Sequence, residues 1–307
     1  MLTIPSRRDV SALADAVNAV IPSVAVGFSR VLDDDRVSVL YASRYGIGGY
    51  ILAAADVPEV LSPTSESRRM VAALNAETSG AIEWQLFHAD VRHLRSLPVP
   101  GVDPAARFWI GLAHDVSLTP DQESALDAVG ATSARVLTAS VPLDETAHQL
   151  QRLELAAKLL PALLRVLDVR GVFDLLSTIS QEALPHDMLT LGVFNDDCSM
   201  LTLFARTGRG SDVGRRFPQP YPKSVMQTWE FDIIDDRLTY PLEQDRPPTK
   251  LGMRSSLRIP FRFEGRSIGG LGIHAFEAGK YSNADIVVAR RIADYVALAL
   301  SHHRLAE

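Results

Sequence analysis

The sequence predicts an α+β fold made of two similar domains that a long helix joins. The first observation is an internal repeat, because residues 268–275 (IGGLGIHA) and the capped apolar helix after them resemble residues 109–115 (WIGLAHD) and the helix after those. The second is the order of elements, since each half begins with a helix, a proline and a hairpin around an acidic turn. The third is the length, because 307 residues are enough for about two domains of roughly 150 residues each. A repeat of this length indicates a domain duplication rather than a solenoid.

Composition bounds the class of protein. Apolar residues make up 47% of the chain, enough for two ordinary cores, and the net charge of −6 argues against a nucleic-acid-binding surface. The single cysteine, Cys198, excludes an internal disulfide and indicates a reducing compartment. Residues 1–9 lack the apolar segment of a signal peptide, and no run of ~18 apolar residues is present for a membrane span. We therefore expect a cytoplasmic protein that binds neither a membrane nor, directly, a nucleic acid.

The first half is predicted to begin with a helix at residues 9–21. Val10, Leu13 and Val17 recur there at helical spacing, and Pro22 ends the helix. The elements predicted next are a hairpin of residues 24–32 and 37–41, a helix at 64–75, strands at 81–88 and 108–116, and a helix that begins at 119–121 with a cap residue and a proline.

The middle of the chain, residues 143–167, is predicted to be a long amphipathic helix. Pro161 is expected to kink or break it. A heptad seam of this length favours a homodimeric coiled coil, and packing of the helix on its own domain is the alternative. The seam consists of Leu143, Leu150, Leu153, Ala157, Leu160, Leu164 and Leu167.

The second half repeats the pattern of the first half more clearly. Ser282 is placed to cap the closing helix, whose stripe of Val288, Ile292 and Tyr295 is a second candidate dimer surface. The elements predicted are a helix at residues 172–183, a hairpin at 189–194 and 200–205, a short helix at 221–228, strands at 231–234, 255–263 and 266–276, and the closing helix at 284–305.

The second half resembles a GAF domain over about residues 168–305. The resemblance is carried by the string 252–261 (GMRSSLRIPF), the turn 264–266 (EGR), the strand 268–271 (IGGL) and the Tyr281-Ser282 start of the closing helix. The first half looks like a degenerate copy, since it keeps the Ile-Gly strand and the capped helix but lacks the Arg-Ser-Ser string. The family implies a six-stranded antiparallel sheet in each domain. It also implies first and last helices on one side of the sheet, and short helices and loops that close a ligand pocket on the other.

The resemblance implies a degenerate GAF-like domain at residues 1–142, a linker helix at 143–167 and a GAF domain at 168–307. The second half is most similar to the N-terminal sensory region of sigma-54-dependent transcriptional regulators. That similarity implies a homodimeric module of a bacterial signalling or transcription regulator. The module would sense a small molecule and pass a ligand-dependent helix movement to an output domain or a partner. The alternative is a ligand-free dimerisation or interaction scaffold. The sequence identifies neither the ligand nor a cofactor.

The expected strand register places the candidate ligand site. If Glu264-Gly265 is a two-residue turn, Ser255, Leu257 and Ile259 share a sheet face with Gly270, Gly272 and His274. Residues 221–234 are expected to cover that face. The first domain lacks the matching string, so its pocket is expected to be smaller or filled. The residues predicted to bind ligand are Phe204, Tyr221, Met226, Trp229, Met253, Ser255, Leu257 and His274.

Several charged or polar side chains leave alternatives open. His274 is either a core histidine or a ligand contact, and Arg258 either reaches water or Glu264 or recognises an anionic ligand. Arginines 206, 209, 215 and 216 flank a Gly-rich loop. A solvated loop is favoured over a phosphate cradle there, because no Walker or dinucleotide fingerprint follows a strand at this place.

Enzymatic and metal-binding motifs are not apparent in the sequence. The acidic turns lack calcium-loop spacing, zinc spacing does not occur, and no nucleophile, base and orienting group stand out together. The GAF-type methionine sulfoxide reductases need several cysteines, and this chain has one. We therefore expect no metal site and no catalytic activity.

Overall fold

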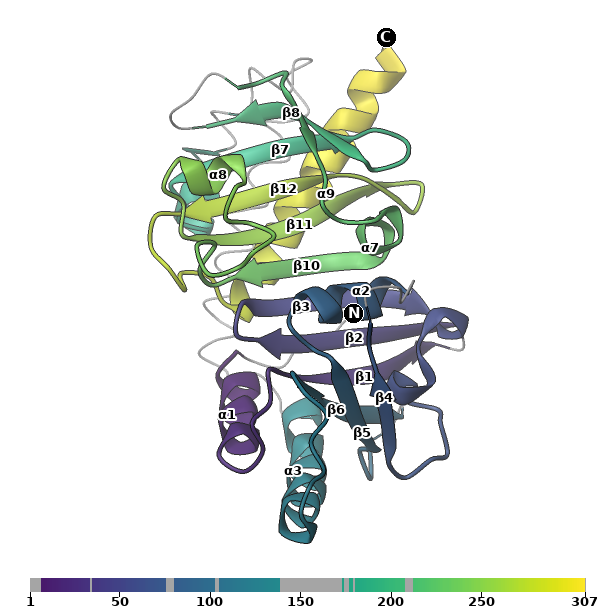
Figure 1. Cartoon of the computed structure of the whole chain (residues 1–307). Coiled ribbons are helices and arrows are strands. Elements are labelled where there is room, and N and C mark those ends of the chain that lie inside the picture. Colours follow the sequence, from purple (N-terminus) through teal and green to yellow (C-terminus); the bar gives the residue numbers. More distant parts are fainter. Residues whose placement is uncertain are drawn as a thin grey trace. The chain divides into compact units, whose positions relative to one another are not determined.

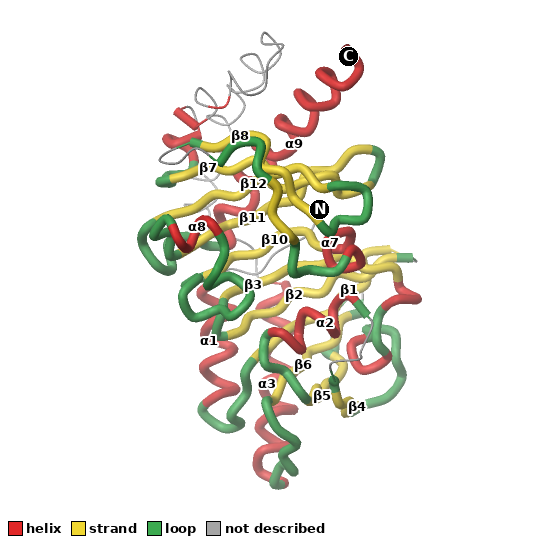
Figure 2. The backbone as a smooth tube through the Cα atoms, turned by 45° about the horizontal axis from the view of Figure 1, so that its top comes forward, coloured by secondary structure: helices red, strands yellow, loops and turns green. Residues whose placement is uncertain are grey.

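The computed structural model describes residues 7–33, 35–75, 80–102, 105–138, 173, 177–178, 180–207 and 212–306. The chain divides into two compact units, the first of Met1–Ser140 with Thr228–Glu230 and the second of Val141–Gln227 with Phe231–Glu307. Both units combine antiparallel strands with helices, which confirms the α+β class (Figure 1 and Figure 2). The predicted linker helix at residues 143–167 lies outside the described residues and stays a prediction.

The first unit is an antiparallel sheet with helices on both faces. Phe28 and Phe108 lie in one core with Leu126 of α3. Tyr41 lies on the other face of the sheet, where its hydroxyl accepts a 2.9 Å hydrogen bond from Gln85 of α2. The described strands are ordered β4-β5-β6-β1-β2-β3. The elements are α1 (Arg7–Asn18), β1 (Ala25–Asp33), β2 (Arg36–Ser43), β3 (Gly46–Ala53), β4 (Met70–Ala73), α2 (Ala81–His88), β5 (His93–Pro98), β6 (Ala106–Leu112) and α3 (Pro120–Thr138).

The second unit is also an antiparallel sheet with helices on both faces. Its described strands are ordered β10-β11-β12-β7-β8-β9. The elements are β7 (Met188–Phe194), β8 (Met200–Arg206), β9 (Arg216–Pro218), α7 (Lys223–Thr228), β10 (Trp229–Ile234), α8 (Pro247–Lys250), β11 (Ser255–Phe263), β12 (Arg266–Ala275) and α9 (Asn283–Ala306).

The two units share one strand order. Counted within each unit, the described strands run four, five, six, one, two, three across the sheet. The repeated Ile-Gly strand is the sixth in both, and it pairs with the first strand in both, as β6 with β1 and β12 with β7. A shared order is what a duplicated domain would produce.

Two elements of the first unit differ from the prediction. Residues 81–88, predicted as a strand, form α2, in which Ile82, Gln85 and Leu86 are buried at helical spacing. Residues 64–75, predicted as a helix, instead contain β4, which pairs with β5. A short apolar run fits either period, so the contacts made in the folded unit decided both outcomes.

The register of β11 and β12 differs from the prediction by one residue. Phe263 pairs with Arg266 as expected, but Arg262 pairs with Ser267 and Phe261 pairs with Gly269. Residue 268 is therefore an extra residue in β12, which is the arrangement of a β-bulge. Because side chains alternate between faces, a one-residue shift moves all later side chains of one strand to the other face.

The observed register changes which side chains share a face. His274 pairs with Ser256, and Gly272 pairs with Arg258. His274 therefore lies on the face of Ser256 and Arg258. The prediction that it shares a face with Ser255 and Leu257 is wrong, because the bulge was not foreseen.

The two faces of this sheet have opposite chemistry. Leu257, Ile259, Leu271 and Ile273 are fully buried on one face, and α9 packs on β11. The polar side chains of β11 and β12 lie on the other face, under α8 and the loops beside it. Figure 1 shows α8 and α9 on opposite sides of these strands.

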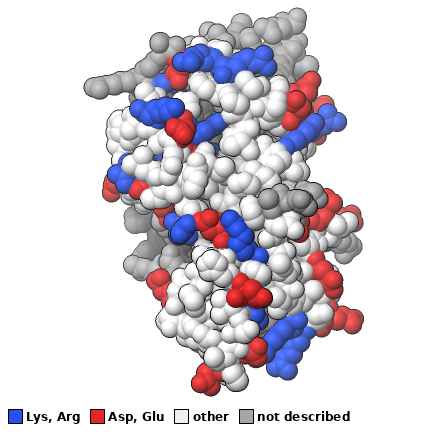
Figure 3. Space-filling model, in the orientation of Figure 1, with Lys and Arg blue, Asp and Glu red and all other residues white. Residues whose placement is uncertain are grey.

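One face of the molecule carries charges of both signs. Figure 3 shows acidic and basic side chains interspersed on the face that it draws. Within the described residues, no helix combines the length and the apolar character that crossing a membrane requires.

Candidate functional site

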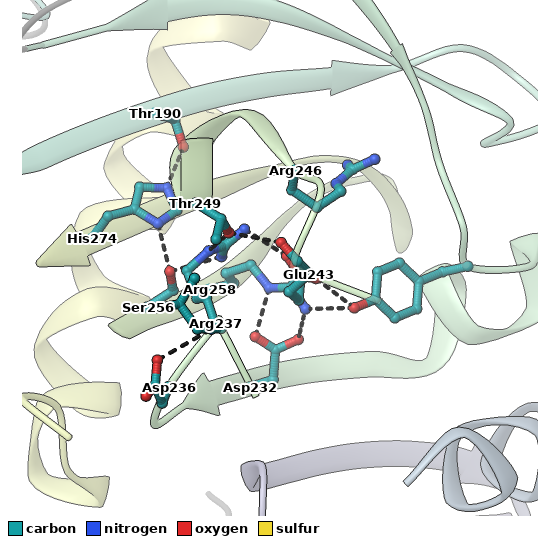
Figure 4. A network of polar contacts seen from close by, with 12 residues as sticks. Thr190, Asp232, Asp236, Arg237, Glu243, Arg246, Thr249, Ser256, Arg258 and His274 are labelled. Carbon is teal, nitrogen blue, oxygen red and sulfur yellow. Dashed lines mark hydrogen bonds and ion pairs between the residues drawn. The ribbon is translucent and has the colours of Figure 1, made fainter. Parts of the chain in front are cut away.

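Arg258 of β11 is the centre of the polar face and holds two carboxylates (Figure 4). Its Nε and Nη2 donate to the two oxygens of Asp232 at 2.7 and 2.6 Å, and its Nη1 donates to Glu243 Oε1 at 2.7 Å. The contact with Asp232 is bidentate, which is a strong geometry for a guanidinium and a carboxylate. Arg258 therefore pairs with Asp232 and Glu243, and the expectation that it pairs with Glu264 is wrong.

A second arginine, the buried Arg237, binds the same glutamate. Its Nη2 donates to Glu243 Oε2 at 2.6 Å, its Nη1 to Ser256 Oγ at 2.9 Å and its Nε to Thr249 Oγ1 at 2.9 Å. Thr249 in turn donates to the backbone carbonyl of Glu243 at 2.7 Å. Arg237 lies in the segment that connects β10 to α8 and covers the polar face. These bonds attach this covering connection to β11.

Glu243 lies between the two guanidinium groups, and its side chain is fully buried. The Tyr221 hydroxyl donates to Glu243 Oε1 at 2.6 Å and accepts from Arg258 Nη2 at 3.1 Å. Burial by itself would raise the pKa of Glu243, but the charges of Arg258 and Arg237 outweigh it and hold the pKa at about 2. Glu243 is therefore ionised at neutral pH.

His274 extends the network to β7. Its Nδ1 lies 2.6 Å from Ser256 Oγ, and its Nε2 lies 2.9 Å from Thr190 Oγ1. Burial, and then the positive charges of Arg237 and Arg258, hold the pKa of His274 well below its usual value. The neutral imidazole is held in place on this face by one hydrogen bond at each of its nitrogens.

We expect His274→Gln to reduce the pH dependence of stability. The folded chain favours the neutral imidazole, whereas an unfolded histidine takes up a proton near pH 6.5. Stability from His274 is therefore present above about pH 6.5 and is lost as the pH falls below it. Urea unfolding at several pH values between about 7.5 and 5.5 measures this loss, which is steeper in the wild type than in His274→Gln.

The exposed His114 supplies the control for that experiment. His114→Gln is expected to keep the wild-type slope. His186, whose pKa burial also lowers, remains in every variant, so the slope of His274→Gln is reduced and not abolished. Equal slopes for the three proteins would contradict the assignment of a neutral His274.

The contacts of this network hold side chains in place, and its geometry is not that of a catalytic site. Ser256 and His274 resemble a nucleophile and a base, but their exposed fractions are 0% and 2%. A histidine whose pKa is so low is also a weak base at neutral pH. Among the described residues, no three His, Cys, Asp or Glu side chains are grouped so as to hold a metal ion.

The structure brings two of the predicted ligand residues, Tyr221 and His274, into one network. Ser255 lies elsewhere, on the face toward α9, and its Oγ donates to the Glu277 carbonyl at 2.7 Å. Leu257 is fully buried on that same face. The other predicted residues are Phe204, which is partly buried, and Met226, Trp229 and Met253, which are buried. Their role in binding a ligand stays a prediction.

The remaining members of the network were missed in the sequence. Asp232 stands between two buried apolar residues, as Arg258 does, so this alternation was a usable signal for a polar sheet face. Arg237 and Glu243 lie in a connection without regular periodicity, which gives no local signal. The missed residues are Thr190, Asp232, Arg237, Glu243, Thr249 and Ser256.

The corresponding face of the first unit is aromatic. Tyr41, Tyr50 and Trp109 are buried there, with ring centroids 6.2 Å apart for Tyr41 and Tyr50 and 6.5 Å apart for Tyr41 and Trp109. A Cβ on Gly27 would lie 2.2 Å from the Trp109 ring. Gly27 is thus needed because the indole ring fills the space beside it.

Comparison with known proteins gave similarities among solved structures only. No protein-family model matches the chain, and no curated protein sequence matches it. The chain is similar to the GAF domain from a phosphoenolpyruvate-protein phosphotransferase of Coxiella burnetii, with 22% identity, 52% of this chain and 97% of that chain covered, and a TM-score of 0.45.

Two further structures are similar over about half of this chain. The GAF domain from the Acinetobacter phosphoenolpyruvate-protein phosphotransferase has 13% identity, covers 52% of this chain and 96% of its own, and gives a TM-score of 0.42. The free methionine-R-sulfoxide reductase from Neisseria meningitidis has 16% identity, covers 55% of this chain and 96% of its own, and gives a TM-score of 0.43.

Proposed function

We propose that this chain is the tandem GAF sensory part of a cytoplasmic bacterial regulator, with no catalytic activity of its own. The proposed limits are residues 1–142 and 168–307 for two domains, each with a six-stranded antiparallel sheet, and 143–167 for the helix that joins them. The second domain binds a small molecule, and the chain works as a homodimer that acts on an output domain or a partner, as in sigma-54-dependent regulators. The shared strand order of the two units and the GAF-like string at 252–261 support this proposal.

The observation that carries the proposal is the two-sided construction of β11. On one face, Ser256 and Arg258 hold the covering connection through Arg237 and Glu243. On the other face, Leu257 belongs to the apolar layer against α9. A ligand that rearranges the polar face therefore acts on the strand that supports the closing helix. Such a two-state change requires only that the ligand bind one arrangement better than the other.

Native mass spectrometry of the purified chain tests the sensing role. A small molecule retained in the native spectrum and absent from the denatured one is the expected result. Hydrogen exchange along α9 then tests the coupling, since adding that molecule back to stripped protein should change exchange in α9. A chain that retains nothing and that no metabolite stabilises in a thermal-shift screen would refute the sensing role.

A ligand-free scaffold is the second candidate, and one observation favours it. Arg237, Arg258, Asp232 and Glu243 satisfy one another on the polar face without any ligand. A scaffold would dimerise equally well whether or not metabolites are removed. Sedimentation of stripped and unstripped protein separates the two candidates on this point.

A further inference from the structure

Arg206, the last residue of β8, is a buried arginine whose donors are only partly used. Its side chain is 3% exposed, and its Nη1 donates to Asp212 Oδ1. Its Nε and Nη2 have no acceptor among the described residues. Arg206 is therefore not a solvated side chain. A buried donor without an acceptor is energetically unfavourable. Two such donors on one side chain therefore suggest that an acceptor from outside the described residues binds there.

The two unpartnered donors are the pair that binds carboxylates elsewhere in this chain. Nε and Nη2 lie on the same edge of a guanidinium and match the two oxygens of a carboxylate. Arg258 uses this edge for Asp232, Arg254 uses it for Asp236, and Arg36 uses it for Asp33. In Arg206 the same edge is buried and holds no carboxylate of the residues that the structure describes.

The strand register places Arg206 on the polar face of the sheet. Arg206 pairs with Thr190, Thr190 with Gly272, and Gly272 with Arg258, so these four residues form one row across β8, β7, β12 and β11. Strands are about 4.8 Å apart, which puts the backbone of Arg206 roughly 14 Å from that of Arg258. Thr190, between them, is bonded to His274. The side chain of Arg206 thus extends from the same face of the sheet as the network.

We propose that the Nε and Nη2 edge of Arg206 binds the carboxylate of a small organic ligand on this face. The inference rests on the proposed sensing function and names the chemical class of its ligand. Asp212 already balances the charge of Arg206, which favours a singly charged planar carboxylate over a phosphate dianion.

Thermal unfolding with small anions tests the proposal. The probes are the sodium salts of acetate, succinate and glutamate, with phosphate and chloride at matched ionic strength. A carboxylate at about 100 times its Kd should raise the Tm of the wild type by roughly 5–10 °C above chloride. Arg206→Met should lose that shift. Arg206→Lys, which keeps the charge but not the paired donors, should bind at least tenfold more weakly.

Arg216→Met is the matched control, because Arg216 is an exposed arginine of β9 beside the same loop. It should keep the wild-type shift. Without ligand, Arg206→Met is expected to unfold below the wild-type Tm, because it leaves the largely buried Asp212 without its ion-pair partner. The ligand shift of each variant is therefore measured from its own ligand-free Tm. The proposal is overturned if Arg206→Met keeps the carboxylate shift, if phosphate gives the larger shift, or if chloride gives an equal one. Retention of a small molecule by Arg206→Met in native mass spectra would contradict the proposed role of Arg206, and it would still support the sensing function.

Discussion

Replacing Glu243 with glutamine should destabilise the second unit by about 3–5 kcal/mol. The substitution keeps the shape of the side chain and removes the one charge that both Arg237 and Arg258 contact. Arg237 is 2% exposed, so it cannot recover the lost interaction from water. The loss is expected to appear in urea unfolding at neutral pH as a lower midpoint with an unchanged slope.

Two comparisons make this result specific to the buried network. Glu277→Gln removes an exposed carboxylate that lies 3.8 Å from Lys280, and it should leave the midpoint unchanged. The double variant Arg237→Met/Glu243→Gln removes one charge of each sign, so it should be less destabilised than the sum of its single variants. Additive losses would mean that the two side chains stabilise the unit independently.

The sequence contained enough to predict five of the six described strands of the second unit, but not β9 or the register of β11 and β12. Alternating side chains and the Glu264-Gly265 turn predict β11, β12 and the pairing of Phe263 with Arg266, and all of these are present. The bulge at residue 268 left no signal, because an isoleucine is equally suited to a regular strand position. One unforeseen residue was enough to move His274 to the opposite face from the predicted one.

The network was harder to predict than the strands, for a physical reason. Its members come from β7, β10, β11, β12, α8, the segment before α7 that holds Tyr221, and the connection that contains Arg237 and Glu243. Their contacts therefore exist only in the folded unit. A charged residue in an apolar strand, such as Arg258, shows that a buried partner is needed. It does not show which distant carboxylate will supply it.

The stabilisation by Glu243 is expected to disappear in acid. The pKa of Glu243 falls from an ordinary value of 4.5 to about 2 in the folded chain. A group with a depressed pKa stabilises the fold above its unfolded pKa, and that contribution is lost as the pH falls toward the folded pKa. A change of this size corresponds to about 3 kcal/mol, lost between about pH 4.5 and pH 2.

The difference in unfolding free energy between wild type and Glu243→Gln measures this contribution together with its coupling to Asp232, because carboxylates outside the network titrate in both proteins. The difference should be largest at neutral pH and should shrink by about 3 kcal/mol as the pH falls from 4.5 toward 2. Glu277→Gln replaces a side chain that is 74% exposed, and it should follow the wild type throughout. A difference that stays constant from pH 7 to pH 2 would show that Glu243 acts through its shape and hydrogen bonds. In that case the ion pairs with Arg237 and Arg258 would not be what holds the covering connection to β11.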